Sequence, residues 1–107
     1  MPNYLLTYKG ASKPDSPEEG QKLMARWQEW VKNVSDRIVM QNTPLGAAKT
    51  VDKNGITDLT EPVQTNGITA ISADSLEDAL AVAQSCPHTE IGQIEVREMF
   101  EMPGSKS

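Results

Sequence analysis

Short runs of apolar and β-branched residues alternate along the chain with segments whose apolar residues recur at helical spacing. The first run, residues 4–9, is rich in aromatic and aliphatic side chains and ends at Gly10. Both alternating sets of side chains in this run are largely apolar, which is typical of a strand covered on both faces. We therefore expect residues 4–9 to form a central strand of a sheet.

The segment after this strand predicts a long helix over residues 17–34. Ser16 is a favourable N-cap, Pro17 suits the first helical position, and Glu19 lies three residues after the cap. Apolar side chains then recur at helical spacing and form one stripe, whose members are Leu23, Trp27, Trp30, Val31 and Val34. We expect this stripe to pack against the sheet, with both tryptophans in the core.

The middle of the chain predicts a strand followed by a hairpin. Residues 38–41 have the composition of a second strand, and the stretch 42–46, which contains a proline and a glycine, is expected to break it. The Asn-Gly pair at 54–55 readily takes the positive φ angles of a tight turn. We therefore expect residues 47–51 and 56–59 to pair across that turn.

The last third of the chain predicts a strand at residues 67–72 and then a second helix. Either Asp74 or Ser75 is expected to cap this helix, and Pro87 is expected to end it. Its predicted apolar stripe consists of Leu76, Leu80 and Ala83, with support from Ala79.

A final strand is predicted from Gln93 to about Met102, and residues 103–107 have the composition of a frayed tail. Residues 1–102 then form one domain with the order β-α-β-(hairpin)-β-α-β. This split βαβ pattern is typical of a ferredoxin-like α+β fold. The helices cover one face of such a sheet, and the apolar first strand indicates that the other face is covered too. A second copy of the chain would cover it, so we expect a homodimer.

Composition and charge exclude several function classes. The 107 residues include 10 Lys and Arg against 15 Asp and Glu, for a net charge of −5, so we expect no nucleic-acid partner. Anionic membranes are disfavoured for the same reason, and no apolar run approaches the ~20 residues that span a bilayer. The first residues lack the pattern of a signal peptide. The single cysteine, Cys86, cannot form an internal disulfide, which favours a cytoplasmic location.

Six segments, taken in order, carry a resemblance to a known family. They are Tyr4-Leu5-Leu6, Ser16-Pro17-Glu18-Glu19, Thr43-Pro44-Leu45-Gly46, Ala70 to Ala83, Cys86-Pro87-His88 and Ile94-Glu95-Val96-Arg97-Glu98. Over about residues 3–102 the chain resembles the YCII-related (DGPF) family. The resemblance implies a ferredoxin-like fold that forms a dimeric α/β barrel, and it implies no particular reaction.

Two stretches depart from the pattern of this family. Residues 57–62 stand where one branch has the Asp-Gly-Pro-Phe motif, and only Asp58 is carried over from it. The loop at residues 10–13 holds no histidine, whereas another branch has one there that is paired with an aspartate.

Two residues are candidates for acid–base catalysis. His88, the only histidine, follows Pro87 just beyond the predicted helix, where it could act as a general acid or base. Asp58, which follows the predicted hairpin turn, could be a pocket carboxylate. The alternatives are a helix-terminal histidine bound to carbonyl groups and a turn aspartate bound to nearby backbone.

Three further residues are candidates for ligand binding. Glu95 and Arg97 share one face of the last strand, opposite Ile94 and Val96, and Arg97 could hold a carboxylate or phosphate as a fork. The alternative for this pair is an ion pair between strands or subunits. Tyr8 lies near the end of the first strand, where pockets are commonly framed.

Metal, cofactor and nucleophile chemistry find little support in the sequence. His88 and Cys86 alone do not make a metal-ligand set, and no Gly-rich loop is present to cradle phosphates. We therefore expect neither a metal nor a cofactor. Cys86 is expected to be buried and unreactive, because it lies at the end of the second helix's apolar stripe.

Three function classes remain open. The first is a small barrel that binds or converts a small molecule in a mostly apolar pocket between two sheets. The second is a non-catalytic dimeric module that binds a ligand or a protein, and it predicts a pocket without an acid–base pair of shifted pKa. The third, by analogy of fold, is a cofactor-free monooxygenase-like enzyme. The residues alone do not decide whether the protein is an enzyme.

Overall fold

The computed structural model describes residues 1–100, so the expected end of the last strand at Met102 and the expected tail lie outside the described residues. The elements, in chain order, are β1 (Asn3–Lys9), α1 (Pro17–Asn33), η1 (Ser35–Arg37), β2 (Ile38–Pro44), β3 (Lys49–Asp52), β4 (Gly55–Asp58), β5 (Thr65–Ser72), α2 (Leu76–Gln84), η2 (Pro87–Glu90) and β6 (Gln93–Met99). Both η elements are short 3₁₀ turns.

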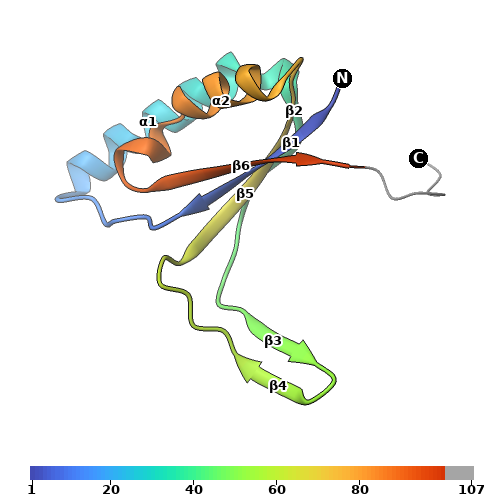
Figure 1. The fold of residues 1–107 in the computed structure, drawn as a ribbon. Helices are drawn as coiled ribbons and strands as arrows, with labels where there is room; N and C mark the ends of the chain where they lie inside the picture. Colours follow the sequence, from blue (N-terminus) through green and yellow to red (C-terminus); the bar gives the residue numbers. More distant parts are fainter. Residues whose placement is uncertain (101–107) are drawn as a thin grey trace.

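Four strands form one antiparallel sheet in the order β2-β5-β1-β6, and β3 pairs with β4 in a separate hairpin. Strand β1 is therefore central, as its two apolar sets of side chains predict. Figure 1 shows α1 and α2 on one side of the sheet, while the β3–β4 hairpin extends away on the other side. The predicted ferredoxin-like α+β fold with an extra hairpin is confirmed.

The register of the sheet divides its side chains between two faces. Leu6 of β1 lies opposite Thr69 of β5 and Val96 of β6, so these three share the face that the helices cover. Leu5 lies opposite Ala70 and Arg97 on the other face, which we call the open face. The predicted assignment of Val96 to the helix side and of Arg97 to the opposite side is confirmed.

The core lies between the helices and the sheet. Tyr4, Leu6, Tyr8, Trp30, Ile71, Ala73, Ala79, Val82, Ala83 and Cys86 form its buried cluster, with Trp27, Val34, Ile94 and Val96 packed against it. Helix α1 begins as predicted, because the Ser16 side chain accepts a hydrogen bond from the Glu19 amide. Among residues 1–100, no helix is long and apolar enough to cross a membrane.

The apolar stripe predicted for α2 is wrong in part. Leu76 and Leu80 are 45% and 43% exposed, whereas Ala79, Val82 and Ala83 face the core. Both sets have helical spacing, so the sequence pattern alone does not choose between them. Small side chains allow the helix to lie close to the sheet, and this contact sets the rotation of the helix.

Two local predictions in the middle of the chain also need correction. Strand β2 continues through Asn42 and Thr43 to Pro44, although residues 42–46 were expected to break it. Because β2 is an edge strand, a proline costs it no ladder hydrogen bond on the outer side. In the hairpin turn only Gly55 has a positive φ, at 132°, and Asn54 does not.

Candidate functional site

Two adjoining hollows lie between α1 and the edge strand β2, and together we call them the α1–β2 groove. The larger has a volume of about 430 Å³ and is lined by Met24, Trp27, Gln28, Val31 and Asn42. The smaller, of about 170 Å³, is lined by Trp30, Val31, Ile38, Gln41, Asn42 and Thr69. The two share Val31 and Asn42. No side chain that lines either hollow is charged, so the groove is an apolar channel with a few neutral polar groups.

A β-bulge supplies two of those polar groups. Met40 pairs with Ala70 and Thr43 with Ile68, so Gln41 and Asn42 together lie opposite the single residue Thr69. A bulge of this kind re-aims side chains at a sheet edge and is frequent beside functional sites. Here it brings two neighbouring amide side chains to the lining of the same groove.

Thr69 lies at the inner end of the groove and is 1% exposed. Its Oγ1 atom accepts a hydrogen bond from the Tyr8 hydroxyl at 2.7 Å. Burial raises the pKa of the Tyr8 phenol far above its ordinary value, so that the hydroxyl stays protonated and remains a donor. The hydroxyl of Thr69 has one hydrogen to donate, and no group of residues 1–100 accepts it.

A buried cluster stands behind Thr69 on the helix side of the sheet. The Tyr8 ring lies edge-on to Trp27 with centroids 5.3 Å apart and is 5.2 Å from the His88 ring. His88 Nε2 lies 2.9 Å from the Lys9 carbonyl oxygen, so this nitrogen carries the proton and donates it to the backbone. Burial raises the pKa of the nearby Cys86 thiol to about 11. The expectation of a buried Cys86 is thus confirmed.

The structure brings some of the sequence-predicted site residues together and separates others. Tyr8 and His88 are in contact inside the core, and Glu95 and Arg97 form an ion pair of 3.1 Å on the open face. Asp58 lies on the hairpin, where its side chain is 82% exposed and pairs with Lys49 at 2.5 Å. Figure 1 shows the hairpin well away from α2 and the turn that follows it.

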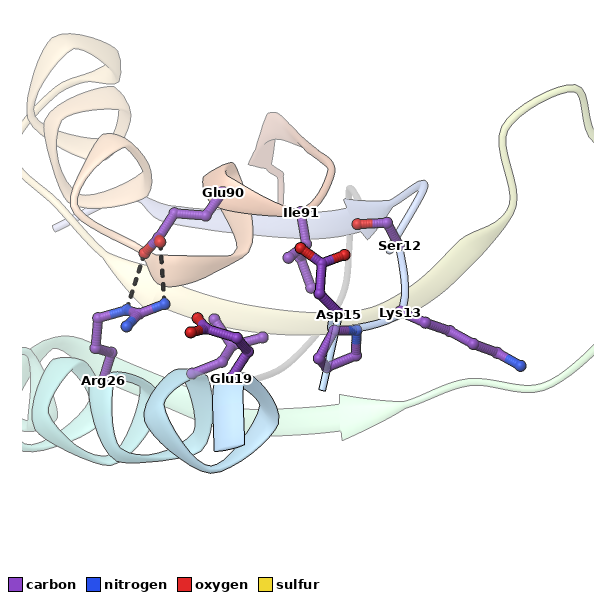
Figure 2. Close-up of a pocket in the computed structure, with 9 residues that line it drawn as sticks. Ser12, Lys13, Asp15, Glu19, Arg26, Glu90 and Ile91 are labelled. Carbon is purple, nitrogen blue, oxygen red and sulfur yellow. Dashed lines mark hydrogen bonds and ion pairs between the residues drawn. The ribbon is translucent and has the colours of Figure 1, made fainter. Parts of the chain in front are cut away.

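A separate hollow, of about 220 Å³, is polar and lies between the β1–α1 loop, α1 and η2 (Figure 2). Arg26 of α1 forms two hydrogen bonds of 3.0 Å with the Glu90 carboxylate across it. Lys13 points away from this hollow, while Asp15 and Glu19 add negative charge beside it. The guanidinium is therefore already neutralised by Glu90, and carboxylates outnumber cations in the lining of this hollow, which disfavours an anionic ligand.

Among residues 1–100, no group of three or more His, Cys, Asp or Glu side chains lies close enough to hold a metal ion. The groove residues Gln41, Asn42 and Thr69 were not among the candidates from the sequence. Their proximity depends on the register between β2 and β5, and only the bulge makes two consecutive residues line one hollow. The sequence offered one signal for this site, which is the run of neutral polar residues at 41–43, where the predicted strand ends.

Comparisons with known proteins agree with this architecture. The model of the YCII-related domain matches residues 4–103. No curated protein matches the chain. A solved structure of 5-chloro-2-hydroxyhydroquinone dehydrochlorinase from Burkholderia phenoliruptrix AC1100, in complex with 2,5-dihydroxybenzoquinone, is similar with a TM-score of 0.59 and 15% identity, over 97% of this chain and 99% of that one. At this identity the likeness concerns the fold alone.

A second similar structure is the Arabidopsis thaliana protein At3g17210. It has a TM-score of 0.46 and 14% identity, over 100% of this chain and 99% of that one.

Proposed function

Because the chain belongs to the YCII-related domain family, we propose that it is a dimeric barrel protein that binds a small organic molecule in the α1–β2 groove of each subunit. The observation that carries this proposal is the uncharged groove, in which a β-bulge makes Gln41 and Asn42 line the same hollow as the buried Thr69. Apolar walls with a few convergent polar groups are what small-molecule sites usually offer. The proposed site lies between helix and sheet, whereas the sequence led us to expect a pocket between two sheets.

Binding accounts for the geometry better than acid–base catalysis does. Burial raises the pKa values of both Tyr8 and Cys86, so both groups are protonated at neutral pH and neither is a ready base or nucleophile. The Nε2 atom of His88 is held by the Lys9 carbonyl. A role for His88 as a general acid or base remains a prediction.

We also propose that a second copy covers the open face. This face carries the apolar side chains of Leu5, Ile68, Ala70, Met40 and Met99. Met40 and Met99 are 37% and 44% exposed in the single chain, so a second sheet would remove apolar surface from water there. Glu95 and Arg97 lie on the same face and would line that interface. In this proposal Asp58 belongs to a hairpin that extends on the partner's side of the sheet (Figure 1).

We further propose that the chain forms a single domain and that the protein is cytoplasmic. The match to the family over residues 4–103 supports one domain across residues 1–102. The free and buried Cys86 suits a reducing compartment, which supports the cytoplasmic location. Fractionation of cells that produce the protein would test this location.

A native mass spectrum of the purified protein tests binding and assembly together. We expect a dimer with additional mass from a retained small molecule. If none is retained, a ¹H–¹⁵N spectrum recorded with a library of small organic fragments should show shifts that cluster on the groove residues Trp27, Val31 and Asn42.

Two variants locate the bound molecule. In Val31→Trp a large ring fills the groove, so we expect loss of the bound mass and of the fragment shifts, with the fold retained because Val31 is partly exposed. The matched control is Leu80→Trp, at a 43% exposed position on the outer side of α2, which should behave as wild type. Binding that survives Val31→Trp contradicts the proposed site.

A further inference from the structure

The lining of the α1–β2 groove narrows the chemistry of its ligand, and this inference rests on the proposed function. We propose that the groove takes an uncharged aromatic alcohol of the phenol class. Its ring would lie on the apolar wall, and its hydroxyl would bind between Thr69 and the amides of the β2 bulge.

The absence of charge among the lining residues selects a neutral ligand. An anionic ligand needs a cation or a set of backbone amides to replace its lost hydration, and the two hollows are lined by neither Lys nor Arg. A cationic ligand would need a carboxylate, and none lines them. Arg26, Glu90, Glu95 and Arg97, which could serve such ligands, pair with one another elsewhere.

The apolar wall favours a flat ring over a flexible chain. Trp27 and Trp30 meet edge to face, with centroids 5.6 Å apart and planes at 85° to each other, and both contribute to the groove. Rings pack favourably against aromatic faces and edges in such offset arrangements. Val31, which belongs to both hollows, supplies an aliphatic surface between them.

The donors and acceptors of the groove match a hydroxyl group. Because Thr69 Oγ1 already accepts from Tyr8, its own hydrogen is available to a ligand oxygen. The side-chain amides of Gln41 and Asn42 each offer a carbonyl oxygen to a ligand donor. A phenolic hydroxyl both accepts and donates, so it satisfies both groups at once. An ether or a ketone oxygen only accepts, so it would satisfy the Thr69 hydroxyl but not the amide carbonyl oxygens of Gln41 and Asn42.

Four fluorinated probes test this assignment by ¹⁹F NMR titration of the full chain. They are 4-fluorophenol, 4-fluoroanisole, fluorobenzene and 4-fluorobenzoate, which share one ring and differ in the polar group. We expect 4-fluorophenol to bind about three- to tenfold more tightly than fluorobenzene, with 4-fluoroanisole between them. We expect 4-fluorobenzoate to bind most weakly. Tightest binding of the benzoate, or equal binding of all four, would overturn the assignment.

Variants of Thr69 identify the donor. Thr69→Val keeps the shape of the side chain but removes the hydroxyl, so the preference for 4-fluorophenol over fluorobenzene should fall, with only the bond to the bulge amides left. Thr69→Ser keeps the hydroxyl and should retain the preference. Since Thr69 is buried, Asn42→Ala at the exposed bulge provides a second variant whose folding is not at risk, and it should also reduce the preference for the phenol. An unchanged preference in both Thr69→Val and Asn42→Ala contradicts the proposal.

The outcome separates this inference from the proposed function. If the four probes do not bind, yet Val31→Trp still removes a retained molecule or fragment shifts, the groove is a binding site and the assignment to phenols is wrong. If no compound of any class reaches the groove, both proposals fail.

Discussion

Tyr8 links the core of the molecule to the proposed site. Its ring contacts Trp27 and His88, and its hydroxyl donates to Thr69, which lines the groove. Sequence position suggested Tyr8 as a ligand-binding residue, because it lies near the end of a central strand. In the structure its side chain is buried, so it acts on the groove through Thr69 instead of lining it.

The hydrogen bond between Tyr8 and Thr69 should contribute measurably to stability. Tyr8→Phe removes the donor and leaves the buried Thr69 oxygen without it, so we expect a loss of about 1–2 kcal/mol in the free energy of unfolding. Urea denaturation measures this value. The double variant with Thr69→Val should lose less than the sum of the single losses, because both partners of one interaction are then absent. Strict additivity of the two losses would contradict the interaction.

Burial of Cys86 and Tyr8 predicts a loss of stability in alkaline solution. In the unfolded chain the thiol ionises at its ordinary pKa of 9.0, whereas the folded protein holds it protonated up to about 11. The unfolded state therefore gains stability as the pH rises from about 9 to 11, and the raised pKa of Tyr8 acts in the same direction above 10.0.

Thermal unfolding measured between pH 7 and pH 11 checks this expectation. Cys86→Ala should reduce the slope of the decline above pH 9. The folded protein should also react with a thiol reagent at pH 8 only as fast as it opens. Rapid labelling of native Cys86 would show that the thiol is accessible, contrary to its 1% exposure.

At the scale of elements, the first turns of α1 and the residue before β6 differ in how closely other parts of the chain approach them. Glycine occurs at both, for different reasons. Gly20 lies in the first turns of α1, and a methyl group there would meet only Pro14, at 3.4 Å. Gly92 leads into β6, and a methyl group there would come within 2.7 Å of His88 Nε2 and still closer to the Lys9 carbonyl oxygen. The contact that holds His88 against β1 thus requires glycine at position 92.

These two glycines should respond to alanine in opposite directions. Gly20→Ala should stabilise the protein by about 0.5–1 kcal/mol, because alanine restricts the unfolded chain and favours the helix. Gly92→Ala should destabilise it by about 1–3 kcal/mol, since Lys9 or His88 must move. Denaturant midpoints compare the two variants with the wild type. A neutral Gly92→Ala would mean that the packing between β1, η2 and β6 is looser than the structure shows.

At the scale of the whole molecule, the two sides of the sheet differ in cover. Both helices lie on one side, and the open face carries apolar side chains together with the ion pair between Arg97 and Glu95. The hairpin extends on the open side and exposes Val51 and Ile56, which lie directly opposite each other in its register. A single chain therefore leaves apolar surface in water on two neighbouring elements, which is typical of interaction surfaces.

A charge on the open face should separate the proposed dimer. Ile68→Asp places a carboxylate among Thr7 and Thr43 on that face, and burying it against a second sheet would be costly. We expect a change from dimer to monomer in light scattering at micromolar concentration. Leu80→Asp, on the outer side of α2 and 43% exposed, is the matched control and should stay dimeric. A monomeric wild type would refute the proposed assembly.

Much of the fold follows from local patterns in the sequence. Ser16 and Glu19 place the start of α1 because a cap needs only residues three positions apart. The two apolar sets of β1 indicate a central strand, since only a strand with neighbours and cover on both sides buries both. Alternation along β6 also assigns Val96 and Arg97 to opposite faces. Each of these three features depends only on residues within or next to one element, so the sequence is enough to predict it.

The site, by contrast, was decided by how the elements meet. Which stripe of α2 faces the sheet depends on close packing, and both Leu80 and Ala79 satisfy the helical period. Gln41 and Asn42 line the same hollow as Thr69 because the register between β2 and β5 slips at a bulge, and no local pattern encodes that slip. The sequence by itself determined the elements and their order. Only the tertiary structure decided which side chains share a groove, because that depends on contacts between residues far apart in the chain.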